Sequence, residues 1–108
     1  MESNQVAFAY MRRAMMTSES FDKQYEPIKQ HAEKREYRIT RIFKEEAISG
    51  NKEDRPGILK MLEVLETQRQ SRPVILIESP KRLARNLAVY VRLSKAIEKA
   101  GGRLEVVG

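Results

Sequence analysis

Cysteine is absent from the 108-residue sequence, and histidine occurs once, as His31. Without cysteine the chain can form neither disulfides nor a thiol active site, which is typical of proteins from a reducing compartment. A single histidine without cysteine also argues against a transition-metal site. We therefore expect no metal and no cofactor, and we interpret His31 as an exposed residue on a helix.

Long hydrophobic runs are missing too. The longest apolar runs have the length of a strand, far below the ~20 residues that span a bilayer. Residues 1–4 lack the basic start and the apolar stretch of a signal peptide. The chain also has no glycine-rich loop of the P-loop or dinucleotide-binding type. We therefore expect a cytoplasmic protein with no membrane partner.

Positive charge, by contrast, is in excess. The chain has 21 lysines and arginines against 15 aspartates and glutamates, a formal net charge of +6. Such an excess on a small protein favours a polyanionic partner such as nucleic acid, although a basic surface that only confers solubility has the same composition. Hydrophobic residues make up 41% of the chain and recur periodically, which predicts one folded domain over residues 1–108.

Four segments have the patterns of strands. Residues 5–11 are almost continuously apolar, as in a strand that is buried on both faces. Residues 74–77 are fully apolar and rich in β-branched side chains, which makes them the strongest strand signal. Residues 37–43 alternate more weakly and suit an edge strand, and residues 104–107 form the last strand.

Three helices are predicted between these strands. Pro27 lies within the first helical pattern, and because proline is tolerated near a helix start, the regular helix should begin near residues 22–24. Pro56 marks the start of the second helix, and Gly101-Gly102 ends the third. The inward-facing residues of the third helix are expected to be Leu87, Tyr90, Val91, Leu93 and Ile97.

Strands that alternate with helices predict an α/β fold with right-handed crossovers and a parallel sheet. In such sheets ligands bind beyond the carboxyl ends of the strands, which singles out the segments after Met11, Phe43 and Ile77. Residues 44–54 are interpreted as the loop after the second strand. We interpret their acidic pair, Glu45-Glu46, as solvated rather than as magnesium ligands.

Arginine occurs in all three of these segments. Arg12 and Arg13 follow the first strand, Arg55 closes the loop after the second, and Arg82 and Arg85 follow the third. A guanidinium group keeps its charge and presents a planar fork of donors that matches phosphate oxygens. A single arginine in a loop is usually solvated, but arginines from three loops at one edge of a sheet favour a phosphate site. Helix N-termini in the same region would add backbone amide donors.

Three motifs resemble those of the serine recombinases, the resolvase/invertase family. They occur in the family's order, at suitable spacing, and together cover nearly the whole chain. The segments are Tyr10-Met11-Arg12-Arg13-Ala14, Ala47-Ile48-Ser49-Gly50 followed by Asp54-Arg55-Pro56-Gly57, and Arg82-Leu83-Ala84-Arg85.

The resemblance implies a resolvase-like, flavodoxin-like three-layer sandwich with a mainly parallel four-stranded sheet. It also implies site-specific recombination of DNA, in which a serine hydroxyl attacks the backbone without metal and forms a 5′-phosphoserine link. The family's dimerisation helix and DNA-binding module would follow this domain, and the full-length protein would be a dimer or tetramer. The residues that the resemblance places around the scissile phosphate are Arg12, Arg55, Arg82 and Arg85, with Tyr10 and Gln24 as substrate-binding residues beside them. We expect Arg13 and Lys81 to bind the substrate as well, since both are basic and lie in the segments after the first and third strands.

Two residues depart from the family's pattern. Ala14 stands at the position of the nucleophilic serine, and a methyl group cannot attack phosphorus. Ser18 and Ser20 follow closely, but their hydroxyls would reach the same place only if the segment refolded. Lys81 stands where the family has aspartate, which removes a carboxylate that could orient the arginines or transfer a proton.

The sequence therefore leaves three functions open. The first is a recombinase domain that is inactive as it stands, with Ala14 either native or introduced to trap an inactive form. The second is a non-catalytic DNA-binding or regulatory relative that keeps the arginine pocket. The third is a small α/β module that binds a phosphorylated metabolite or nucleotide at the same strand ends.

Overall fold

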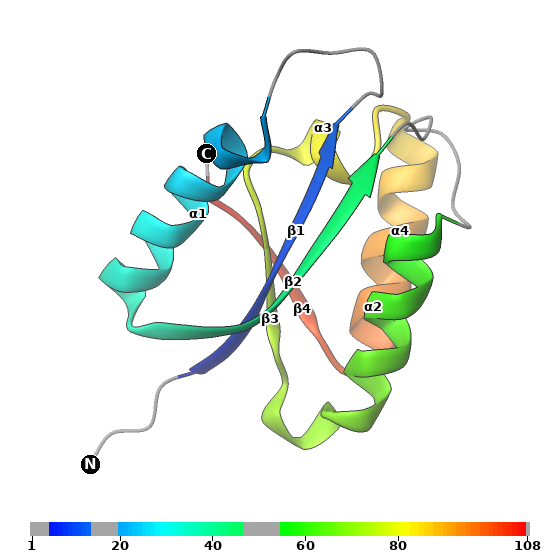
Figure 1. Cartoon of the computed structure of the whole chain (residues 1–108). Helices are drawn as coiled ribbons and strands as arrows, with labels where there is room; N and C mark the ends of the chain where they lie inside the picture. The colour runs from blue at the N-terminus through cyan, green and yellow to red at the C-terminus, as the bar shows by residue number, and fades with distance from the viewer. Residues whose placement is uncertain (1–4, 14–19, 47–54, 108) are drawn as a thin grey trace.

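Four parallel strands form the single sheet of the computed structural model, which describes residues 5–13, 20–46 and 55–107 (Figure 1). The strand order is β2-β1-β3-β4, and every neighbouring pair is parallel. The predicted parallel α/β fold is thus confirmed. The strands are β1 (Gln5–Arg13), β2 (Tyr37–Glu46), β3 (Val74–Ile77) and β4 (Arg103–Val106).

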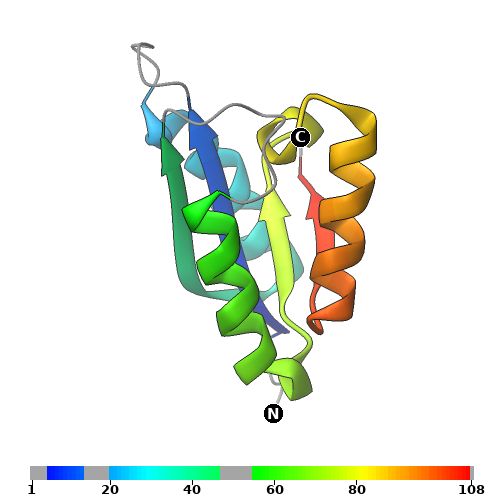
Figure 2. The same ribbon diagram turned by 90° about the vertical axis from the view of Figure 1, so that its right-hand side faces the viewer.

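Helices cover both faces of the sheet, which gives the three layers that were expected (Figure 2). Helix α1 (Phe21–Arg35) lies on one face, and α2 (Pro56–Thr67) and α4 (Leu87–Lys99) lie on the other. Two shorter elements complete the described part of the chain, the 3-10 turn η1 (Arg69–Ser71) and the four-residue helix α3 (Pro80–Leu83). None of the helices in residues 5–13, 20–46 and 55–107 has the length and hydropathy of a transmembrane span.

Strand β1 lies in the middle of the sheet and divides the core into two halves. Ala7 and Ala9 face α1, where their small side chains let the helix approach the sheet closely. Phe8 and Tyr10 face α2 and α4, where aromatic volume fills a wider gap. All four side chains are fully buried. Each large side chain buried in this way contributes about 1.5–3 kcal/mol to folding, so β1 anchors both layers.

Strand β2 lies at one edge of the sheet, as predicted, and it contains a β-bulge. Ala7 pairs with Ile39 but Phe8 pairs with Arg41, so Thr40 is an extra residue in β2. The bulge exchanges the faces of the strand, because successive side chains otherwise alternate strictly. Ile39 therefore packs on the α1 side, whereas Phe43 packs on the α2 side, although both have odd numbers.

Helix α1 begins at Phe21, slightly earlier than the expected start at residues 22–24. Pro27 therefore lies in its second turn, where it lacks the amide that would bond the preceding turn. The helix continues because Ile28 and Ala32 are buried against the sheet. It ends at Arg35, and Glu36, with a positive φ of 61°, caps it by donating its amide to carbonyls of the last turn.

Two of the residues expected on the inner face of α4 are exposed. Leu87 is 76% exposed and Val91 is 41% exposed, so their prediction as inward-facing residues was wrong. Val89, Leu93 and Ile97 form the buried stripe instead. Leu87 precedes Val89 by two positions, and Val91 precedes Leu93 by two. Because two positions correspond to about half a turn of helix, Leu87 and Val91 point away from the buried stripe.

Candidate functional site

The carboxyl edge of the sheet carries a buried polar network that starts at Tyr10 on β1. The Tyr10 hydroxyl donates to Glu45 Oε1 at 2.8 Å and accepts from Arg55 Nη1 at 3.1 Å. Burial raises the pKa of Tyr10 well above its usual range, and the neighbouring Glu45 raises it further, although Arg55 opposes the shift. The phenol is therefore a neutral link between a carboxylate and a guanidinium group.

Glu45 was expected to be solvated, and this expectation was wrong: its residue is 3% exposed. The bulge in β2 turns it toward α2, where its carboxylate accepts bonds from the amides of Gly57 at 2.7 Å and Ile58 at 3.2 Å. These amides belong to the first turn of α2, where a negative charge is stabilised by the helix dipole. A methyl group on Gly57 would lie 2.7 Å from Glu45 Oε1, so the carboxylate and glycine fit each other.

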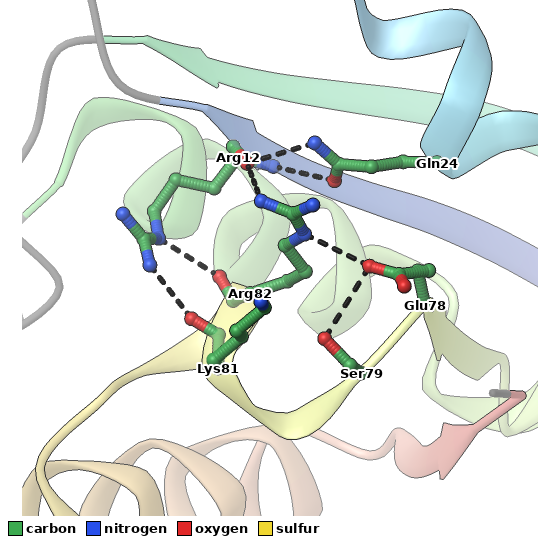
Figure 3. Close-up of polar contacts among 6 residues, drawn as sticks. All are labelled: Arg12, Gln24, Glu78, Ser79, Lys81 and Arg82. Carbon is green, nitrogen blue, oxygen red and sulfur yellow. Dashed lines mark hydrogen bonds and ion pairs between the residues drawn. The ribbon is translucent and has the colours of Figure 1, made fainter. Parts of the chain in front are cut away.

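Arg12 is held at its backbone and reaches across to α3 with its side chain (Figure 3). Gln24 of α1 accepts from the Arg12 amide at 3.2 Å and donates to its carbonyl at 2.9 Å. The guanidinium group donates to the carbonyls of Lys81 at 2.6 Å and Arg82 at 3.0 Å. Arg12 lies inside β1 rather than in a loop after it, since the strand extends to Arg13.

The α3 turn is bound from two further directions. Arg55, which is 1% exposed, donates to the carbonyl of Leu83. Arg82 Nε donates to Glu78 at 2.9 Å, and its Nη1 donates to the carbonyl of Arg12 at 3.3 Å, which places its guanidinium group between β1 and Glu78 (Figure 3). Three carbonyls of this turn, those of Lys81, Arg82 and Leu83, are thereby paired with charged donors. The turn is consequently held against the C-terminal end of β1 and the start of α2.

We name Arg12, Arg55, Arg82 and Arg85 the arginine cluster. Its charges repel one another: burial lowers the pKa of Arg12, and Arg55, Arg85 and Arg82 lower it further. Two carboxylates of the described residues lie beside the cluster: Glu45, which caps α2, and Glu78, which pairs with Arg82. An anion beside the cluster would relieve this repulsion, and a phosphate group has the oxygen geometry that the guanidinium forks match.

The predicted site residues differ in how they are presented to solvent. Arg12 and Arg55 are buried, Arg82 is partly exposed, and Arg85 and Lys81 are exposed. The buried pair therefore holds the turn, while the others form its accessible surface. Tyr10 and Gln24 are buried supports of this arrangement.

Arg13 is not brought into the cluster. Its guanidinium group pairs with Glu46 at 2.8 Å and lies 4.4 Å from the centre of the Phe21 ring, on the α1 side of the sheet. Ala14 and Ser18 lie outside the described residues, as do residues 47–54 with part of the second motif. Ser20 is described, and it is an exposed residue at the N-terminus of α1.

His31 is not the exposed residue that was expected. Its side chain is 20% exposed, and its Nε2 lies 2.5 Å from Glu105 Oε2 on β4. Tyr37 donates to the same carboxylate at 2.9 Å. This group lies away from the arginine cluster and joins α1 to the far edge strand. Within the described ranges, no three acidic or histidine side chains form a group that could hold a metal ion.

The sequence did not predict that Glu45 is buried at the site, because only the bulge decides which face it occupies. One signal for this pairing is present in the sequence: a carboxylate ends the second strand, and the helix after that strand starts with Pro56-Gly57. A glycine in the first turn of a helix permits close approach by another group. Such a pairing becomes visible once the register between β1 and β2 is known.

Comparison with known families identifies the fold and the family together. The family described as "Resolvase, N terminal domain" matches residues 7–108. A search of curated protein sequences finds no significant match.

Solved structures with this fold include several recombinase domains. The C-terminal catalytic domain of ISC1926 TnpA, an IS607-like serine recombinase, is 26% identical, with a TM-score of 0.79 over 94% of this chain and 70% of that one. The N-terminal catalytic domain of TP901-1 integrase is 18% identical, with a TM-score of 0.82 over 94% of this chain and 77% of that one. A resolvase family site-specific recombinase from Streptococcus pneumoniae is 21% identical, with a TM-score of 0.75 over 94% of this chain and 71% of that one. The last two show the shared fold alone.

Proposed function

The chain belongs to the family of resolvase N-terminal domains, and from this premise we propose that its arginine cluster binds the DNA backbone during site-specific recombination. The observation that carries the proposal is the crowding of like charges at the carboxyl edge of the sheet. Parallel α/β proteins bind ligands at this edge. A phosphodiester at this edge would lower the repulsion among the clustered guanidinium groups.

We assign the residues of the site two roles: some contact the DNA backbone, and others support the α3 turn from inside the protein. Arg82, Arg85 and Lys81 contact phosphate oxygens, since they form the accessible surface of the turn. Arg12 and Arg55 hold the turn through its carbonyls and add positive charge behind the phosphate. Such preformed charge stabilises the extra negative charge of a phosphoryl transition state without reorganisation.

The chemistry of strand exchange requires a nucleophile in addition. In the family's reaction a serine hydroxyl loses its proton as its oxygen bonds to phosphorus. The bond from phosphorus to the 3′ oxygen breaks, and the 3′ oxygen takes up a proton. The phosphoserine conserves the energy of the phosphodiester for religation. The side chain of Ala14 is a methyl group without a hydroxyl, so we propose that this chain binds DNA without forming the covalent link.

A second candidate function follows from Ala14 together with Lys81. A chain with Ala14 and Lys81 in these positions suits a non-catalytic DNA-binding or regulatory member of a recombination complex, because both departures leave phosphate binding intact. In either case residues 1–108 act as the catalytic-type domain of a cytoplasmic protein that works on DNA as a dimer or tetramer.

The test is to restore the nucleophile. Ala14→Ser should produce detergent-resistant protein–DNA adducts on supercoiled plasmids that carry the DNA flanking the gene. The unaltered chain and the double variant Ala14→Ser/Arg82→Ala should yield none. Equal adduct formation by the unaltered chain would show that another residue is the nucleophile and would contradict the proposed role of Ala14. If Ala14→Ser forms no adducts, the chain is not a recombinase whose activity depends on residue 14, and the non-catalytic function is favoured.

A further inference from the structure

A groove of about 590 Å³ lies beside the arginine cluster, between α3 and the first turns of α4. Its surface combines apolar side chains with two positive charges, and none of the described residues that line it is acidic. The lining residues are Pro80, Lys81, Ala84, Arg85, Leu87 and Tyr90. The groove is therefore chemically amphipathic, with cations next to apolar surface.

Leu87 is the most prominent apolar residue of this groove. It is 76% exposed, whereas the other large exposed apolar residues of the described chain range from 41% to 51%. Single exposed leucines are ordinary, but Val91 and the half-buried Tyr90 lie on the same side of α4, at spacings of four and three residues. The Asn86 side chain accepts from the Val89 amide and fixes the start of the helix. Leu87 is thus presented on a defined backbone.

The groove is continuous with the arginine cluster. Lys81 and Arg85 belong to the segment whose carbonyls Arg12 and Arg55 hold, at Lys81, Arg82 and Leu83. If one phosphate of a DNA strand binds at Arg82 and Arg85, the next nucleotide of that strand would therefore lie in this groove. A second copy of the chain fits less well, because two such faces would bring Lys81 and Arg85 of both copies together.

We propose that this groove is a DNA-contact site, in which Lys81 and Arg85 bind backbone phosphates and Leu87 and Tyr90 pack against the adjoining sugar or base edge. Leucine is one of the side chains that proteins press against base steps in the minor groove. The inference rests on the proposed function and deepens it. The apolar contact sets the position of the strand relative to the arginine cluster.

The experiment compares two exposed leucines. Leu87→Ser is the test, and Leu59→Ser is the matched control, since Leu59 is 51% exposed in the first turn of α2. Affinity is measured by fluorescence anisotropy at several salt concentrations, with a fluorescein-labelled DNA duplex of mixed sequence as the probe. Loss of a buried leucine contact should weaken binding by Leu87→Ser about tenfold. Leu59→Ser should bind as the unaltered chain does.

The salt dependence separates apolar contact from charge. Leu87→Ser should leave the slope of log affinity against log salt unchanged, whereas Lys81→Ala should reduce its magnitude by about one. Binding by Leu87→Ser equal to that of Leu59→Ser would overturn this inference alone. Dissociation of an oligomer by Leu87→Ser, with DNA affinity unchanged, would assign the groove to self-association and also overturn it. No DNA binding by the unaltered chain at low salt would overturn the proposed function as well.

Discussion

At the scale of single residues, Tyr10 shows how the site is built from buried polar groups. Its hydroxyl uses both hydrogen-bonding functions, one toward Glu45 and one toward Arg55. Burying a polar group without partners is costly, and buried charge more so. The phenol therefore stabilises the folded chain only while it is protonated and able to donate to Glu45.

This arrangement predicts a loss of stability at high pH. The pKa of Tyr10 is raised in the folded chain above the ordinary value of 10.0, so its contribution is complete below that value and is lost as the pH rises above it. Urea unfolding followed by circular dichroism at about pH 8 and about pH 11 measures the fall. Tyr10→Phe should be less stable at the lower pH and should show a smaller fall between the two. An equal fall in both proteins would contradict this account of Tyr10.

Residue types and their spacing predicted much of the site. Tyr10, Arg12, Arg55 and Arg82 were all expected at one edge of the sheet, and the structure joins them in one network. Their division into buried supports and exposed contacts was not predictable, because it depends on where the carbonyls of the α3 turn lie. Those carbonyls carry no side-chain signal in the sequence.

At the scale of secondary-structure elements, the contact between α1 and β4 depends on a polar group in an otherwise apolar layer. Glu105 of β4 meets His31 and Tyr37, and Arg103 lies 3.1 Å from its carboxylate. Burial raises the pKa of Glu105, but the hydrogen bonds from His31 and Tyr37 outweigh this effect and the pKa is lowered overall. The carboxylate therefore holds α1 and the start of β2 to the far edge strand.

This contact predicts a loss of stability in acid. Because the pKa of Glu105 is lower in the folded chain than the ordinary 4.5, its contribution is present above that value and is lost as the pH falls below it. Glu105→Gln should lower the free energy of unfolding at about pH 7 by roughly 1–3 kcal/mol. Its stability should also change less than that of the unaltered chain between about pH 6 and about pH 3. Urea titrations across this range measure both effects, and identical acid profiles would rule out this role for Glu105.

The order and type of the elements followed from hydrophobic periodicity, but the faces of two elements did not. In β2 the bulge at Thr40 exchanges the faces, and an alternating pattern gives no sign of an inserted residue. In α4 the apolar residues extend around more of the helix than the sheet covers, so Leu87 and Val91 had the composition of core residues. Both differences matter for function, since the bulge brings Glu45 to the site and Leu87 lines the groove.

At the scale of the whole molecule, charge and fold act together. The net charge of +6 does not by itself define a binding site. The parallel sheet defines one, because it brings arginines that are distant in the sequence together at one edge. The resolvase family assignment and the α/β fold were both predictable from the sequence, because the motifs and the strand–helix alternation agree. The role of the segment that contains Ala14 remains a prediction, since it lies outside the described residues.

The central claim is that the arginine cluster binds DNA phosphate, and the salt dependence of DNA affinity tests it most directly. The double variant Arg82→Ala/Arg85→Ala is compared with Arg38→Ala, an exposed arginine near the opposite end of the sheet. Circular dichroism first establishes that each variant is folded. We predict that the double variant binds a DNA duplex more weakly and loses roughly two units from the slope of log affinity against log salt, while Arg38→Ala keeps both values. An unchanged slope in a folded double variant would contradict the claim.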